Sequence, residues 1–273
     1  MKKLVKILLT LAALSFAFNF ASCSGGSSSS SDDDSYESGT TTSGSGSGSS
    51  NPGNTSTNPG NGGTGIESGN TTTQNAFTGK TFVTAVLETN YSSASSNKAE
   101  ACVTILSFNS EINVTQSQIR SLIKNGTVKE NKKLSGENCT YSVSGSTATI
   151  ATSEGNASFT LSSDGKKLTN NEGNLTLADG TVYAYIDANV SSKSKANVQI
   201  IVLGSGGKGK FTEKSSKNGT NTTKENFDFT YTLSGSNFSL KVGSDTATGT
   251  LSSDKKKLTI DFGDEGLTEY TKL

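Results

Sequence analysis

The chain has 273 residues, of which 30% are hydrophobic, and it contains no His, no Trp and one Arg, Arg120. This composition excludes mechanisms that need an imidazole base or a His-ligated metal, and it leaves little for a bidentate Arg clamp on phosphate. Lys and Arg number 24 and Asp and Glu number 24, so nothing indicates a basic face built for nucleic acid. We expect no nucleic-acid partner, no cofactor and no enzymatic activity.

The amino terminus has the pattern of an export signal. Lys2, Lys3 and Lys6 form a positively charged start. The apolar run that follows, Ile7 to Phe18, is too short for a stable membrane-spanning helix but suits the core of a signal peptide. We predict a signal peptide over residues 1–22 and export of the rest.

The end of this segment, Phe20-Ala21-Ser22-Cys23, resembles the lipobox at which bacterial lipoproteins are cleaved and acylated. Phe at its first position resembles the looser lipoboxes of spirochaetes and some other bacteria. The resemblance implies that residues 1–22 are a lipoprotein signal peptide and that Cys23 is lipidated, which makes the lipid bilayer a partner. Ser24 replaces the Asp that holds many lipoproteins in the inner membrane, so we expect the outer membrane or the cell surface. The alternative is an ordinary secretory signal with an incidental Cys.

Residues 23–75 are predicted to be a disordered linker that begins with the lipidated Cys. The 52 residues from Ser24 to Asn75 contain 15 Ser, 12 Gly, 9 Thr and 6 Asn, and they carry five acidic residues without Lys or Arg. Such a segment has too little apolar surface to offset the entropy of ordering it. As a Gly/Ser coil it would reach roughly 40 Å, enough to hold a folded module clear of a membrane.

The rest of the chain is an internal duplication. The matched blocks are Tyr141–Ser146 with Tyr231–Ser236, Leu161–Thr169 with Leu251–Thr259, Lys124–Thr127 with Lys217–Thr220, and Ala101–Leu106 with Ala196–Ile201. The offset between the copies drifts from 95 to 90 residues along the chain, as loop insertions would cause. We predict two structural units, 76–178 and 179–273.

Within each unit apolar residues alternate with polar ones, as in half-buried strands. Turn sequences such as Ser163-Asp164-Gly165 separate neighbouring runs. The second unit has eight runs, near Val182–Asp187, Asn197–Leu203, Lys208–Glu213, Asn226–Leu233, Asn237–Val242, Thr246–Leu251, Lys257–Phe262 and Leu267–Lys272.

Eight consecutive antiparallel strands favour a closed meander barrel, because closure removes unpaired edges. The expected fold class is therefore all-β, with two tandem antiparallel β-barrels. One larger barrel or sandwich shared by both units is the alternative.

One helix is expected, in the first unit. Thr115 and Gln118 fit a capping box, and Gly126 follows the helix end. Three apolar residues between these positions share one face: Ile119, Leu122 and Ile123. We expect this face to plug one mouth of the barrel; a lid is the functional alternative.

Several motifs resemble a known group of proteins. They are Gly79-Lys-Thr-Phe82, the strand end Tyr-x-Val/Leu-Ser-Gly, the hairpin Thr-Leu-Ser-Ser-Asp-x-Lys-Lys-Leu-Thr, and the terminal Tyr270-Thr-Lys-Leu273. Together they resemble small lipocalin-like repeats of bacterial, notably spirochaete, lipoproteins. The resemblance implies a lipocalin-like barrel and a small apolar ligand in its lumen. It transfers no binding residue, because these are turn and strand motifs.

The side chains expected to face the lumens are large. They are Tyr141, Val143, Phe229, Tyr231, Leu233, Phe238 and Leu240. Side chains of this size fill an eight-stranded barrel, which would shift recognition to the outer surface or rims and favour a protein partner. An apolar lumen cavity near roughly 300 Å³ would instead support small-molecule binding.

Three further features have a structural interpretation. Cys102 and Cys139 are expected on opposite faces of their strands, with Cys139 inward, which disfavours a disulfide although export permits one. The run Gly204–Lys210 lacks the Gly-Lys-Ser/Thr ending of a phosphate-binding loop and predicts a flexible hairpin loop. The lysines at 166–167 and 255–257 lie on predicted turns and indicate solvated edges rather than an anion site.

The sequence therefore predicts a membrane-anchored surface lipoprotein that acts as a binding or interaction module. No residue is assigned to catalysis, to a cofactor or to a metal, because the acidic residues show no calcium-loop spacing and no acid–base pair. A structural envelope lipoprotein is the main alternative. An enzyme that uses lumen carboxylates or Lys is less favoured.

Overall fold

The computed structural model describes residues 75–263 and 266–273. The predicted signal peptide, Cys23 and all of the predicted linker before Asn75 lie outside these residues. The described part of the chain falls within one compact unit. Within it no helix has the length and the apolar character of a membrane span.

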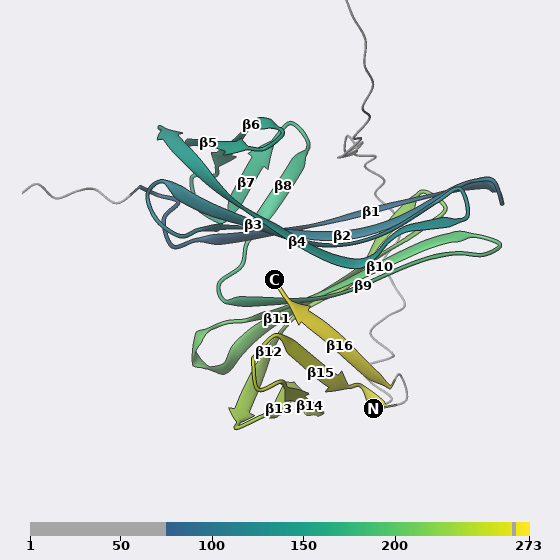
Figure 1. Ribbon diagram of the computed structural model, residues 1–273. Helices are drawn as coiled ribbons and strands as arrows, with labels where there is room; N and C mark the ends of the chain where they lie inside the picture. The colour runs from purple at the N-terminus through teal and green to yellow at the C-terminus, as the bar shows by residue number, and fades with distance from the viewer. Residues whose placement is uncertain (1–74, 264–265) are drawn as a thin grey trace, which may run out of the picture. The chain divides into compact units, whose positions relative to one another are not determined.

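The first copy is a closed antiparallel barrel, barrel 1, in which each strand pairs with the next (Figure 1). Its strands are β1 (Thr81–Ser93), β2 (Ser96–Phe108), β3 (Asn113–Lys124), β4 (Thr127–Ser144), β5 (Thr147–Thr152), β6 (Gly155–Leu161), β7 (Lys167–Asn170) and β8 (Gly173–Leu177). Strand β8 closes the barrel by pairing with Phe82 and Val83 of β1. The first four strands are long and continue beyond this closure as a four-stranded sheet.

The second copy forms barrel 2 with the same topology. Its strands are β9 (Thr181–Val190), β10 (Ser194–Leu203), β11 (Lys208–Lys217), β12 (Thr220–Ser234), β13 (Asn237–Val242), β14 (Asp245–Leu251), β15 (Lys257–Asp261) and β16 (Leu267–Lys272). A short 3₁₀ turn, η1 (Ser205–Gly207), joins β10 to β11. The prediction of two tandem antiparallel meander barrels is confirmed, and each of the eight runs expected in the second copy lies on a strand.

The predicted helix is wrong. Thr115 lies in β3, and Gly126 lies in the turn after it. Strand β3 pairs with β2 on one side and with β4 on the other along almost its whole length. Ile119 is buried, whereas Leu122 and Ile123 are only half-buried, so the three apolar residues form no single face. The two ladders supply more backbone hydrogen bonds than one local helix could, and they override the capping signal.

Each barrel has its own packed lumen. The lumen of barrel 1 is filled by Phe77, Phe82, Leu106, Phe108, Val114, Cys139, Tyr141, Ala148, Ile150, Phe159, Leu161, Leu168 and Leu175. The lumen of barrel 2 is filled by Tyr183, Ile201, Phe211, Phe229, Phe238, Leu240, Ala247, Leu251, Leu258, Ile260 and Tyr270. Where a strand contributes two residues to a lumen cluster, they lie an even number of positions apart, as the pleat of a strand requires.

A third apolar cluster lies between the two copies and is called here the shared core. It consists of Val83, Ala101, Val103, Ile105 and Ile119 from barrel 1, Ala178 from the connection, and Val182, Ala184, Ile186, Ala196, Val198 and Ile200 from barrel 2. These residues alternate with the lumen residues, so they come from the outer faces of the long strands. The copies are therefore two closed barrels whose outer faces pack together as a sandwich.

The strands that meet in this sandwich do so reciprocally. In chain order, β1, β2 and β3 of barrel 1 correspond to β9, β10 and β11 of barrel 2. Strand β2 packs on its own counterpart, β10. The contact of β1 with β10 is matched by that of β2 with β9, and the contact of β1 with β11 is matched by that of β3 with β9. Exchanging the two copies leaves these pairs unchanged, as in an isologous, twofold interface, whereas a smaller contact of β1 with β12 has no counterpart of the same size. The duplicated units thus pack as two subunits of a symmetric dimer would.

Hydrogen bonds fix one end of the sandwich. The buried hydroxyls of Thr89 and Ser216 lie 2.7 Å apart, and the Gly219 N–H donates to Thr89 Oγ1 at 2.8 Å. Ser194 Oγ donates to the Asn90 carbonyl at 2.6 Å. Polar pairs in an otherwise apolar contact set its register, because each would lose its partner if the sheets slid.

Candidate functional site

The side chains predicted to face the lumens divide into three groups. Tyr141, Phe229, Phe238 and Leu240 are buried in the lumen clusters, and Tyr231 packs against the cluster of barrel 2. Val143 and Leu233 differ from the prediction, because 36% and 45% of their surfaces are exposed. They continue the same alternation but lie at the ends of β4 and β12, beside the turns to β5 and β13, where no strand covers them.

A turn, rather than a helix, plugs the lumen of barrel 1. The ring of Phe77 lies 5.3 Å from that of Phe108 and 6.4 Å from that of Tyr141, centroid to centroid. Asn75 holds the turn, because its Oδ1 accepts from the Phe77 and Thr78 N–H groups at 3.0 Å each. The plug therefore comes from the residues just before β1.

Aromatic rings fill barrel 2. Tyr231 stacks on Phe238 at 5.7 Å, and the Tyr231 hydroxyl donates to the Gly204 carbonyl at 2.8 Å. The Phe229 ring covers Gly209 on the neighbouring strand, where a Cβ atom would approach it to 2.3 Å. Such interiors leave no room for a ligand of ordinary size.

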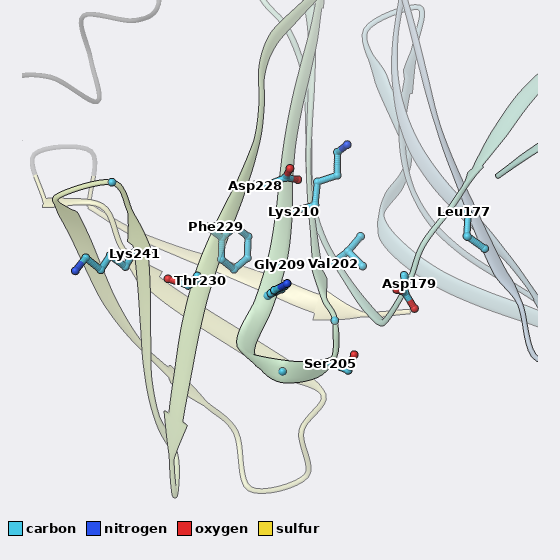
Figure 2. Close-up of a pocket in the computed structure, with 14 residues that line it drawn as sticks. Leu177, Asp179, Val202, Ser205, Gly209, Lys210, Asp228, Phe229, Thr230 and Lys241 are labelled. Atoms are coloured by element: carbon cyan, nitrogen blue, oxygen red, sulfur yellow. The ribbon is translucent and has the colours of Figure 1, made fainter. Parts of the chain in front are cut away.

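One cavity is an open groove on the outer face of β10–β13, with a volume of about 1040 Å³ (Figure 2). Lys208, Lys210 and Lys241 line it together with Asp179 and Asp228. Lys210 and Asp228 are cross-strand neighbours on β11 and β12. The groove thus carries both signs of charge and has no single electrostatic preference.

The glycine run at the end of this groove serves close packing. A Cβ atom on Gly204 would lie 2.7 Å from the Asp179 carbonyl oxygen, and one on Gly207 would lie 2.6 Å from the Tyr231 carbonyl oxygen. Gly207 also has a φ of +68°, which side chains resist. The backbone of this loop therefore rests against the connection between the copies and against β12, which agrees with a hairpin loop rather than a phosphate cradle.

Another cavity, of about 390 Å³, lies at the mouth of barrel 1 and is called here the mouth cavity. Its lining is polar: Gln116, Gln118, Ser135, Gly136, Glu137 and Ser153. Gln118 Nε2 donates to Thr104 Oγ1 at 3.2 Å, and the Ser153 N–H donates to Glu137 Oε1 at 2.8 Å. None of these lining residues was singled out as a binding residue from the sequence.

A network of ion pairs lies next to the mouth cavity, on the face of β2–β4 that is turned away from the shared core and is called here the inner face. Glu100 lies 3.0 Å from Lys98 Nζ and 2.8 Å from Arg120 Nε, and Arg120 Nη1 lies 3.4 Å from Glu130 Oε2. Burial opposes the charge of Arg120, but the neighbouring Glu100 and Glu130 carboxylates outweigh it and raise the Arg120 pKa. The charges are mutually neutralised, so this network orders the sheet next to the mouth cavity.

The two described cysteines are both free and buried. The prediction that they face opposite sides is wrong, because Cys102 alternates with the shared-core residue Val103 and therefore points to the inner side, as Cys139 does. In the strand register, Cys102 of β2 is opposite Arg120 of β3, and Arg120 is opposite Lys133 of β4. Cys139 lies six residues farther along β4, roughly 20 Å away, so no disulfide can form.

Burial raises the pKa of the Cys102 thiol to about 11. A thiol held protonated in this way is a poor nucleophile and a poor metal ligand. Among residues 75–263 and 266–273 there is no group of three or more Cys, Asp or Glu residues that could hold a metal ion.

Searches against protein-family models, curated proteins and solved structures found no match to this chain.

Proposed function

We propose that this protein is a lipoprotein of the bacterial cell envelope, anchored through an acylated Cys23, that presents two fused barrels as a binding module. Recognition takes place on the rims and the outer surface of the barrels. The module performs no catalysis. The bilayer holds the anchor, and a protein or a small polar molecule binds the module.

The observation that carries the proposal is the position of two cavities outside the lumen clusters. Both lumens are filled by apolar side chains, while cavities of about 1040 and 390 Å³ lie on the outer face of barrel 2 and at the mouth of barrel 1. Both volumes fall within the roughly 300–1,000 Å³ range of small-molecule sites or at its upper limit. A small apolar ligand inside a lumen, which the lipocalin-like resemblance implies, would have to displace this packing.

The anchor is supported by the sequence alone. The charged start, the short apolar run and the lipobox-like end at Cys23 occur in the order that export and acylation require. The linker that follows is long enough to hold the barrels away from a surface. Ser24 favours the outer membrane or the cell surface.

Labelling with a fatty-acid probe tests the anchor. In the native envelope the wild-type chain should incorporate the probe, and the Cys23→Ser variant should not. Equal incorporation by the two chains would disprove the anchor.

Binding of a fluorescent long-chain fatty acid tests the location of recognition. Because both lumens are filled, the purified protein should not bind this fatty acid saturably at either lumen. Saturable binding that is lost on enlarging a lumen side chain, as in Ala148→Leu, would show that the lumens are used after all. Ala148 is fully buried within barrel 1, so it reports on that interior.

A further inference from the structure

The two copies provide an internal comparison at the barrel mouths. Gln116 of β3 pairs with Glu137 of β4 in barrel 1, and Phe211 of β11 pairs with Phe227 of β12 in barrel 2. These pairs lie on the third and fourth strands of their copies. They are also separated by the same offsets, 95 and 90 residues, that relate the duplicated blocks. The pairs therefore occupy equivalent positions.

In barrel 2 this position is closed by packing. The rings of Phe211 and Phe227 stack with their centroids 5.0 Å apart and an interplanar angle of 23°. Phe262 packs edge-on against Phe211 at 6.4 Å. The fold thus has a stable, apolar way to seal a barrel mouth at this level, and one copy uses it.

In barrel 1 the equivalent pair is polar and lines the mouth cavity. Gln116 and Glu137 are only half-buried, and the Gln116 amide has no hydrogen-bond partner among the described residues. One Glu137 oxygen accepts from the Ser153 N–H at 2.8 Å, and the Cys139 thiol also interacts with this carboxylate. A carboxylate has about four acceptor sites, so Glu137 retains capacity for a ligand. Stability alone does not account for this difference between the copies, since aromatic packing at the same position buries more apolar surface.

We propose that the mouth cavity of barrel 1 binds a small polyhydroxylated ligand, one or two sugar units in size. The Gln116 and Gln118 amides supply both donors and acceptors, and the Ser135 and Ser153 hydroxyls can do either. The Glu137 carboxylate accepts hydrogen bonds from two neighbouring ligand hydroxyls. Hydroxyl groups satisfy this mixture, because each of them both donates and accepts.

Other ligand classes fit less well. An apolar ligand would leave the amides and the carboxylate without partners, which is costly once water is excluded. A small anion would meet Glu137 directly. A metal cation would find one carboxylate in the lining, Glu137, and would lack the several anionic oxygens that such ions prefer.

This inference deepens the proposed binding function and rests on it, but it does not depend on the lipid anchor. The two therefore fail separately. Equal fatty-acid labelling of the wild type and of Cys23→Ser, together with sugar binding, would refute the anchor alone. Labelling that depends on Cys23, without sugar binding, would refute the ligand alone.

The test uses the full chain purified in detergent and saturation-transfer NMR with glucose, galactose, mannose, N-acetylglucosamine and their disaccharides at up to about 10 mM. At least one of these sugars should show saturable transfer. The variant Gln116→Phe/Glu137→Phe, which copies barrel 2, should weaken binding about tenfold or more, since it removes several hydrogen bonds. It should unfold at the wild-type temperature or above it.

Two further variants keep the result interpretable. Ser135→Ala is exposed, does not disturb packing, and should weaken binding by about threefold to tenfold. Lys241→Gln in the groove of barrel 2 should bind as the wild type does. The proposal is overturned if none of the sugars binds the wild-type chain, or if the double Phe variant folds and binds with unchanged affinity.

Discussion

The shared core predicts that the two barrels unfold together. Ile186 of β9 has none of its surface exposed and packs within the shared core against residues of both copies. Truncation to Ala should cost about 3 kcal/mol, within the 2–5 kcal/mol range for buried Ile or Leu. For a folded part of this size that corresponds to a fall in Tm of roughly 6–12 °C.

Amide hydrogen exchange measures the coupling directly, because it reports on each strand separately. If the barrels unfold as one unit, Ile186→Ala should lower the protection of the slowest amides by the same factor, about 150-fold, in both copies. Strands β2 in barrel 1 and β13 in barrel 2 are suitable probes, since neither contains the substitution. Lys241→Ala is the control, because this exposed residue should change stability by less than about 0.5 kcal/mol.

The reasoning would be refuted by a split response. A loss of protection confined to the strands of barrel 2, or two separate thermal transitions in the wild-type protein, would mean that the barrels are independent domains. Cleavage between the copies followed by separation of two stable halves would lead to the same conclusion.

Three other predictions concern single side chains. Lys255 and Gly165 occupy equivalent hairpin positions with φ of +57° and +69°, so Lys255→Gly should raise the free energy of unfolding by about 0.5–1 kcal/mol and Gly165→Ala should lower it, both measured by urea denaturation. A destabilised Lys255→Gly variant would contradict the strain argument. Cys102 should react with a thiol reagent at pH 8 only as fast as the protein unfolds, and rapid labelling of the native protein, absent from Cys102→Ser, would show that it is accessible. Hydrogen bonds, first from Ser252 Oγ and then from the Lys256 N–H, lower the Asp254 pKa, so its stabilisation is present above the unfolded pKa of about 3.9 and is lost as the pH falls through the lower folded value. The stability difference between wild type and Asp254→Asn should therefore vanish in acid, and a difference that persists at pH 2 would exclude the carboxylate as its source.

Much of the fold could be predicted because its rules are local. Half-buried antiparallel strands alternate every second residue, and the duplication supplied each strand of barrel 2 with a related strand in barrel 1. The turns could be predicted as well, because the same turn sequence occurs in both copies. Asp164 and Asp254 accept hydrogen bonds of the same lengths from equivalent groups, 2.6 Å from the Ser hydroxyl and 3.0 Å from the backbone.

The sequence contains a signal for the mouth cavity that the predicted elements do not use. Alignment of the copies places Gln116 opposite Phe211 and Glu137 opposite Phe227, and a polar-for-aromatic exchange at two positions is a signal. The expected helix hid it, because Gln116 was assigned to a helix rather than to a strand paired with Glu137. Only the register of β3 against β4 brings the two side chains to one cavity.

The chain alone thus determined the alternation, the turns and the repeat, since these depend on neighbours a few residues apart. The tertiary structure decided what each face contacts. Strand β2 is apolar on both sides, with Leu106 in the lumen and Val103 in the shared core, and a periodicity of two cannot tell a barrel interior from an outer face that another barrel covers. The outer face of each barrel is buried only because the other copy packs on it. The alternation of apolar residues therefore could not show which face of β2 carries Cys102, nor that the two barrels share a core.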